Sequence, residues 1–98
     1  MFKALDPLLH SQLRLAVMSL LISMKSAQFT YLKEKTGSTA GNLSVQLDKL
    51  AAAGYVAIEK SFKGKKPVTT VSITPTGIRA FEEYVESLRQ YIDKQQTQ

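Results

Sequence analysis

Cysteine and tryptophan do not occur in this chain of 98 residues, and histidine occurs once, as His10. Without cysteine there is no disulfide framework, no thiol nucleophile and no cysteine-ligated zinc site. A lone histidine has no second ligand at the spacing of a metal site. The sequence therefore predicts neither a metal nor a cofactor.

Long hydrophobic runs are also missing, because no apolar stretch reaches the roughly 18–20 residues of a membrane span. The most apolar stretch, residues 13–24, is interrupted by Arg14, Ser19 and Ser23, and no small-residue cleavage site follows it. We expect no signal peptide, no membrane partner and a cytoplasmic location. The length predicts a single domain over residues 1–98 with one modest core.

Groups for catalysis are scarce as well. General acid–base or nucleophilic chemistry needs several titratable side chains that converge, but four of the eight acids lie in residues 82–93 and the others are scattered along the chain. The sequence predicts no catalytic residue, and we expect a protein that is not an enzyme.

What the chain does have is an excess of positive charge in its middle. The formal net charge is +5, and residues 25–66 alone carry eight lysines against three acids, a net charge of +5. The segments before and after this block are close to neutral. Such a block is typical of a surface that binds a polyanion, although lysines that merely keep a surface soluble would produce the same count.

The predicted first helix begins at Asp6-Pro7, an N-cap residue followed by proline at the first helical position. One apolar stripe at helical spacing runs from Leu9 to Met24. A second stripe contains Leu8, Leu15, Met18 and Ile22. One small core cannot cover both faces, so one face is available for a second subunit.

Residues 31–36 form a predicted short helix with Thr30 as its cap and Gly37 as its stop. Ser38 or Thr39 then caps a third helix over about 39–53, whose inward positions are Leu43, Leu47 and Leu50. Alternating β-branched and aromatic residues predict a hairpin over 55–74, with a basic turn at 63–67. A last helix spans about 75–93. Two short helices joined at a glycine and followed by a basic hairpin are typical of a winged helix-turn-helix.

The stretch GNLSVQLDKLAAAGYV over residues 41–56 is followed by the basic turn KGKKP over 63–67 and by TPTG over 74–77. In that order, and together with residues 5–15 and 29–33, these motifs resemble the small single-domain winged-helix transcriptional regulators related to the MarR and ArsR groups. The resemblance covers about residues 5–90. It implies an α+β fold that is mainly α, and a homodimer that binds duplex DNA and controls transcription. Metal-sensing relatives use Cys or His ligands, so metal regulation does not carry over.

A recognition helix enters the major groove with its N-terminal residues against the base edges, where small side chains allow close approach. Asn42 can pair with adenine, Ser44 can donate or accept, and Val45 can touch a thymine methyl. Matching the motif residue by residue, we expect DNA contacts from Thr39, Ala40, Asn42, Ser44, Val45, Gln46 and Lys49. The alternative is an ordinary polar helix face with a capped start.

The expected wing contacts to phosphate or the minor groove are Lys63, Lys65 and Lys66, against the alternative of a solvated turn. The predicted dimer interface joins the first and last helices. Its residues are Leu8, Leu15, Met18, Ile22, Ile78, Phe81, Val85, Leu88 and Ile92.

The sequence leaves alternatives for His10, for Arg14, for an effector and for the class of partner. His10 is expected at a surface or interface, and Arg14 pairs with an acid of the last helix or reaches a phosphate. With no separate sensor domain, an unknown small-molecule effector would bind at the dimer interface, or there is none. The alternative function is a winged helix that contacts only proteins, although the basic turn favours DNA.

Overall fold

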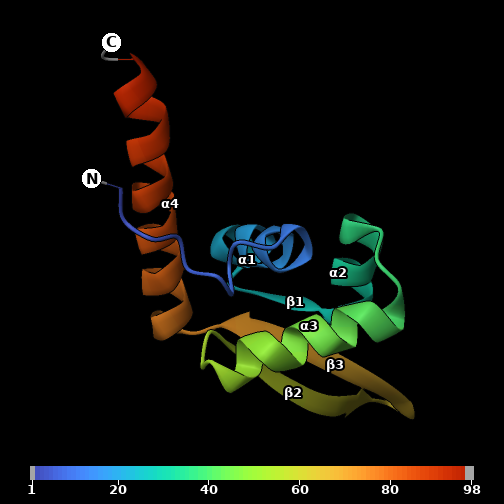
Figure 1. The fold of residues 1–98 in the computed structure, drawn as a ribbon. Coiled ribbons are helices and arrows are strands. Elements are labelled where there is room, and N and C mark those ends of the chain that lie inside the picture. The colour runs from blue at the N-terminus through green and yellow to red at the C-terminus, as the bar shows by residue number, and fades with distance from the viewer. Residues whose placement is uncertain (1, 97–98) are drawn as a thin grey trace.

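The computed structural model describes residues 2–96 and contains four helices and three short strands (Figure 1). The elements in chain order are α1 (Gln12–Met24), β1 (Ser26–Gln28), α2 (Phe29–Thr36), α3 (Ala40–Ala52), β2 (Val56–Lys63), β3 (Lys66–Ile73) and α4 (Pro75–Gln96). The fold is α+β and mainly α, a winged helix-turn-helix, as expected. α4 stands away from the body, and the N-terminal segment runs beside it (Figure 1).

The first helix starts later than predicted, at Gln12 instead of at Pro7. The Asp6 carboxylate accepts from Leu8 N at 2.9 Å, and its carbonyl accepts from Leu9 N and His10 N. Asp6 therefore caps an isolated turn, which Ser11 ends by adopting an extended backbone, φ −150° and ψ 130°. This turn places Leu9, which is fully buried, in the core.

The sequence did not predict the strand β1. Because of this strand, α2 also begins earlier in the chain than predicted. Lys25 ends α1 with a positive φ of 72°, and Ser26–Gln28 then pairs antiparallel with β3, Ala27 opposite Val71. Because the chain enters α2 directly from this strand, the helix begins at Phe29, and Thr30 lies inside it instead of capping it. Gly37 ends α2 in the left-handed conformation, as predicted.

The three strands form one antiparallel sheet in the order β1-β3-β2. The hairpin turn is tighter than expected, since only Gly64 and Lys65 lie between the strands, and Pro67 belongs to β3 opposite Phe62. Proline has no backbone N–H to donate. It is tolerated at position 67 because β1 pairs only with residues 70–72, so no strand faces the edge of β3 at Pro67 and no hydrogen bond is lost.

The core is formed where α1, α2 and α3 pack over the sheet. Its members are buried apolar side chains, and five of them, Leu9, Val17, Leu43, Leu47 and Leu50, belong to the predicted inward stripes. They are Leu9, Val17, Met18, Leu21, Ala27, Leu32, Leu43, Leu47, Leu50, Val56, Val71 and Tyr84. α4 begins with the predicted N-cap followed by proline. The Thr74 hydroxyl accepts from Gly77 N at 3.0 Å, and Pro75 is the first residue of the helix.

Candidate nucleic-acid interface

The N-terminus of α3 is capped by Thr39, not by Ser38. The Thr39 backbone is extended, and its Oγ1 accepts from Asn42 N at 3.1 Å. The Ser38 hydroxyl instead lies 3.0 Å from the Thr36 hydroxyl. With one side chain closing the helix start, the small residues that follow it are left open to solvent. Apart from its chain neighbours and the backbone of its own helix, a Cβ built on Gly41 would meet no atom within 4 Å.

α3 divides into a buried and an exposed face along the predicted line. Leu43, Leu47 and Leu50 are buried, whereas Val45 is 51% exposed. The other exposed positions among the predicted DNA contacts are Thr39, Ala40, Asn42, Ser44 and Lys49. These residues share one surface on which a nucleic acid has room, although their contacts with DNA stay predictions.

Gln46 differs from the rest of this set because it is half-buried and already hydrogen-bonded. Its Oε1 accepts from Nη1 of Arg14, and its Nε2 donates to Asn42 Oδ1 at 3.1 Å. Arg14 also donates from Nε to the Leu8 carbonyl at 2.6 Å. Among the described residues, the side chain of Arg14 therefore donates to two neutral oxygens, and neither belongs to an acid of the last helix.

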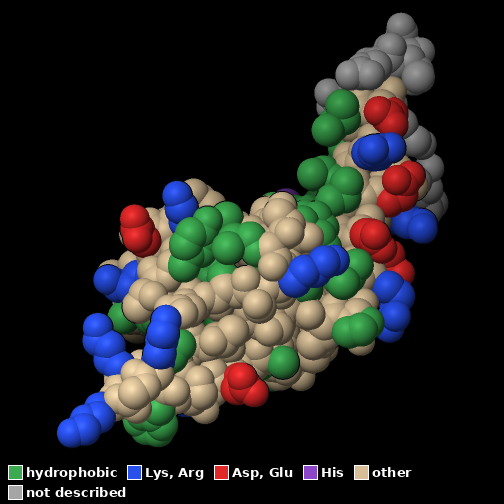
Figure 2. Space-filling view, turned by 180° about the vertical axis from the view of Figure 1, so that it is seen from behind, with side chains coloured by type: hydrophobic (Ala, Val, Ile, Leu, Met, Phe, Trp, Pro, Cys, Tyr) green, Lys and Arg blue, Asp and Glu red, His purple; other side chains and the backbone are tan. Residues whose placement is uncertain are grey.

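The tip of the hairpin carries Lys63, Lys65 and Lys66, and all three are exposed. Lys63 and Lys66 are opposite each other in the strands, so their positions are set by the ladder, and Lys65 lies in the turn. Phe62 is 75% exposed beside them, a feature that our sequence reading missed. Seen from behind, Lys and Arg side chains gather at the end of the molecule that holds the hairpin tip (Figure 2).

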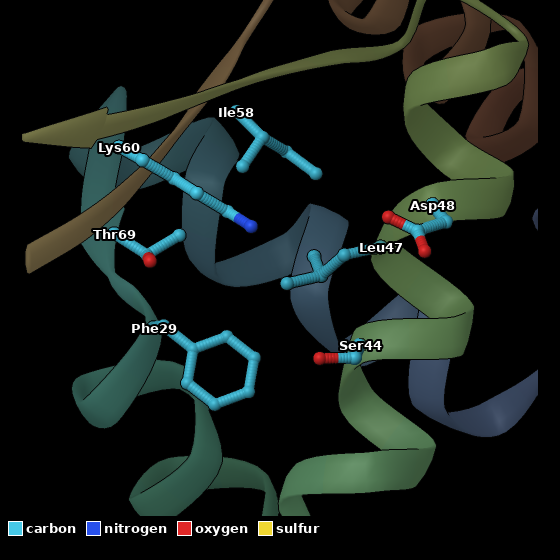
Figure 3. Close-up of a pocket in the computed structure, with 7 residues that line it drawn as sticks. All are labelled: Phe29, Ser44, Leu47, Asp48, Ile58, Lys60 and Thr69. Atoms are coloured by element: carbon cyan, nitrogen blue, oxygen red, sulfur yellow. The ribbon is translucent and has the colours of Figure 1, made fainter.

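A cavity of about 270 Å³ separates α3 from the hairpin (Figure 3). Its walls come from α2, α3, β2 and β3, and its lining residues are Phe29, Ser44, Leu47, Asp48, Ile58, Lys60 and Thr69. Asp48 and Lys60 lie on opposite walls, and Lys60 points into the space (Figure 3). Asp48 is the one acid of α3, and a carboxylate on a reading face can accept a hydrogen bond from cytosine N4.

α4 presents an apolar stripe that the rest of the chain leaves partly uncovered (Figure 2). Val85 is 38% exposed and Ile92 is 51% exposed. Ile78, Phe81 and Leu88 are half-buried, as are Leu8, Leu15 and Ile22 of the N-terminal region. Met18 is the exception in the predicted interface. It is fully buried in the core of the single chain and has no surface to offer a second subunit.

The N-terminal segment covers the neighbouring face of α4. Phe2 stacks on Tyr91 with ring centroids 4.5 Å apart, and Lys3 N donates to Gln90 Oε1 at 3.0 Å. His10 Nδ1 lies 2.9 Å from the Tyr84 hydroxyl, so the histidine links the turn before α1 to α4. These contacts fix α4 on one side and leave the apolar stripe open beside it.

Tyr55, three residues after the end of α3, is hydrogen-bonded to the N-terminal turn. Its hydroxyl donates to Asp6 Oδ2 at 2.6 Å. This hydrogen bond, followed by burial and by the negative charges of Asp6 and Glu83, raises the pKa of Tyr55 to about 12. The phenol is therefore neutral throughout the physiological range.

Within residues 2–96, none of the helices combines the length and the apolar character that a membrane span requires. Within the same range, no three His, Cys, Asp or Glu side chains are grouped as metal ligands would be.

Comparison with known proteins gives three levels of similarity. A family model described as a winged helix DNA-binding domain matches residues 13–92. Over 81 residues the chain is 36% identical to an uncharacterised protein of Methanocaldococcus jannaschii. This match covers 83% of this chain and 88% of that protein.

Solved structures supply the third level. A transcriptional regulator homologue from Pyrococcus horikoshii is 29% identical, with a TM-score of 0.84 over 89% of this chain and 86% of that one. The regulator BldR from Sulfolobus solfataricus is 26% identical, with a TM-score of 0.70 over 89% of this chain and 61% of that one. A MarR-family regulator from Silicibacter pomeroyi, 20% identical, has the same fold with a TM-score of 0.67, over 90% of this chain and 58% of that one.

Proposed function

The chain belongs to the winged helix DNA-binding domain family, and from that premise we propose that it is a transcriptional regulator that binds specific duplex DNA sequences as a homodimer. The matched family is described by DNA binding and the similar solved structures by transcriptional regulation, not by catalysis. The sequence specificity and the dimer are the parts of the proposal that need their own argument.

The observation that carries the proposal is the pairing of an open helix N-terminus with a basic hairpin tip. The start of α3 is capped, made of small residues and exposed, so its first turns fit into a major groove about 12 Å wide. The exposed lysines of the hairpin fit the phosphates or minor groove beside it. Contacts to base edges would then come from α3, and salt-dependent affinity from the wing.

The homodimer is supported by the uncovered stripe of α4. At 22 residues α4 is about 33 Å long, and its stripe repeats every three or four residues, as in a helix–helix seam. Each Leu or Phe that becomes fully buried contributes roughly 1.5–3 kcal/mol, which rewards pairing with a second copy. Leu8, Leu15 and Ile22 add partly exposed apolar surface from the N-terminal region.

The test is a selection of binding sites from random duplex DNA, followed by gel-shift measurement on the selected site and on random DNA at low salt. We expect a recurring motif with two related half-sites, and tighter binding to it than to random DNA. A protein that shifts no duplex even at low salt would favour the alternative, a module that contacts only proteins.

A further inference from the structure

Arg14 connects the first helix to the reading face of α3 through a chain of hydrogen bonds. Its Nε donates to the Leu8 carbonyl and its Nη1 to Gln46 Oε1. Gln46 Nε2 then donates to Asn42 Oδ1 at 3.1 Å. This relay of hydrogen bonds runs from Arg14 through Gln46 to Asn42. It starts at the half-buried guanidinium of Arg14 and ends at the exposed amide of Asn42, where we expect contacts with bases.

The relay has a direction because a guanidinium carries five donors and no acceptor. Gln46 must therefore turn its oxygen toward Arg14, and its NH₂ group faces Asn42. That NH₂ donor holds Asn42 Oδ1, so the Asn42 Nδ2 donors point away from Gln46. Without Arg14, either amide can rotate by half a turn with almost no change of shape, since its oxygen and nitrogen are nearly equal in size.

We infer that Arg14 is a positioning residue that sets the orientation of the Asn42 amide, and so the base edge that α3 accepts. The inference rests on the proposed function. An Asn42 that presents Nδ2 seeks an acceptor in the major groove, such as guanine O6 or N7, adenine N7 or thymine O4. The free energy of holding this orientation is provided by folding, not by DNA binding.

The far end of Arg14 is anchored as well, which is what a positioning role requires. Leu8, whose carbonyl accepts from Nε, is itself held by the bond from its N–H to Asp6 Oδ1 at 2.9 Å. Asp6 also accepts from the Tyr55 hydroxyl. The guanidinium thus spans two fixed points, the turn before α1 and the middle of α3.

The experiment compares wild type with Arg14→Met and Gln46→Glu, using site selection from random duplex DNA and salt-dependent affinities. Met keeps an apolar stem but removes every donor. Glu keeps an acceptor for Arg14 but offers no donor to Asn42. Arg79→Met, at an exposed position of α4, is the control for losing one positive charge.

We expect both variants to change base preference at the same positions that Asn42→Ala changes, and to weaken the selected site about 10-fold. Binding of Arg14→Met to random DNA and its salt slope should match those of wild type and of Arg79→Met. In the double variant Arg14→Met, Gln46→Ala, affinity should equal that of Gln46→Ala alone, because the two residues act through one relay.

Three results would overturn the inference. One is an Arg14→Met protein that loses affinity equally on both DNAs, with a salt slope lower by about two per dimer, because Arg14 would then be a phosphate contact. Another is an unchanged base preference in both variants. A wild type that selects no motif would overturn the proposed function itself and this inference with it. If Arg14→Met does not fold by circular dichroism, Gln46→Glu alone decides.

Discussion

At the scale of single residues, the exposed face of α3 combines short side chains with fixed ones. The Thr39 hydroxyl oxygen already accepts in the helix cap, and both amide ends of Gln46 are hydrogen-bonded, so each has less hydrogen-bonding capacity left for a base. Asn42 and Ser44 are exposed and short, and their polar atoms lie close to the helix axis. Side chains of this kind read bases only when the backbone comes close, which the open start of α3 allows.

Replacing Asn42 or Ser44 with Ala should cost roughly 1–3 kcal/mol of binding on the selected site and little on random DNA, because base contacts carry specificity. Gel-shift titration on both DNAs measures the difference. Ser23→Ala, at an exposed position of α1, is the matched control and should leave both affinities unchanged. Equal losses on both DNAs would mean that another face of the helix reads the sequence.

The Tyr55–Asp6 hydrogen bond makes stability depend on pH in the alkaline range. The pKa of Tyr55 rises from 10.0 to about 12 on folding, so the folded state holds the proton more tightly than the unfolded state. The contribution of this bond is therefore fully present below about pH 10 and is lost as the pH rises toward about 12.

Urea denaturation measures the unfolding free energy of wild type and of Tyr55→Phe. The difference between the two, which reports the Tyr55–Asp6 hydrogen bond, should shrink between about pH 10 and 12. Asp6→Asn keeps the shape of the side chain without its charge, so it should lower the pH at which Tyr55 ionises, as followed by tyrosinate absorbance. A stability difference that stays constant across this range would contradict the assignment.

At the scale of elements, the wing is a regular ladder that ends in a two-residue turn, not a flexible loop. β2 and β3 pair over eight residues each, and the three lysines lie at the last rung and in the turn. The charges are therefore held away from the core at the tip of a stiff hairpin. Such a placement suits contact with a phosphate backbone and contributes little to folding.

The triple variant Lys63→Ala, Lys65→Ala, Lys66→Ala should weaken binding to every DNA sequence. If each lysine neutralises one phosphate in both subunits, the plot of log K against log salt should flatten by up to about five units. The fold, by circular dichroism, should survive. The double variant Lys3→Ala, Arg79→Ala removes exposed charges elsewhere and should keep the wild-type slope. Coincident slopes for wild type and the triple variant would exclude phosphate contacts by the wing.

The first turn of α4 packs so closely on the backbone before β2 that only glycine fits at position 77. A Cβ at Gly77 would lie 2.1 Å from the Tyr55 carbonyl oxygen, which is backbone and cannot move aside cheaply. Gly77→Ala should therefore destabilise the protein by roughly 1–3 kcal/mol in thermal or urea unfolding.

Gly41→Ala is the matched control because position 41 also lies in a helix, but its Cβ would meet nothing beyond its chain neighbours and the backbone of that helix. It should be neutral or stabilise by up to about 1 kcal/mol, since alanine favours the helix more than glycine does. Equal effects of the two substitutions would show that α4 does not dock as described.

At the scale of the whole molecule, the chain is elongated, with extents of 59 × 25 × 20 Å. α4 stands away from the body, and its far half is joined to the N-terminal segment through Gln90 and Tyr91 (Figure 1). A long amphipathic helix with one covered face and one open apolar stripe is poorly stabilised in an isolated chain. Pairing with a second copy through the stripe would supply the missing contacts.

Val85→Glu together with Leu88→Glu should convert a dimer into monomers, because it places two charges in the predicted seam. Sedimentation at about micromolar concentration measures the mass, and circular dichroism reports whether α4 stays folded. Arg79→Glu, which changes charge without touching the stripe, should leave the mass at that of a dimer. A wild type that sediments as a monomer at this concentration would contradict the proposed assembly.

The sequence by itself determined the features that depend on a few neighbouring residues. Thr74-Pro75 starts α4 and Gly37 ends α2 because caps and left-handed stops need only the local backbone. The inward face of α3 followed from the spacing of Leu43, Leu47 and Leu50, since helical periodicity alone puts them on one side. The exposed positions of α3, where we propose the DNA contacts, were predictable as the complement of that face.

The tertiary structure decided whatever depends on partners far away in the chain. β1 exists because β3, about 45 residues later, offers an edge, and no pattern in three residues signals it. Two apolar stripes on the first helix gave no way to tell that Met18 belongs to the core. The hydrogen bond between Arg14 and Gln46, which are 32 residues apart in the chain, exists only because α1 and α3 pack against each other. Long-range contacts arise from packing, and local periodicity carries no information about which distant residue completes them.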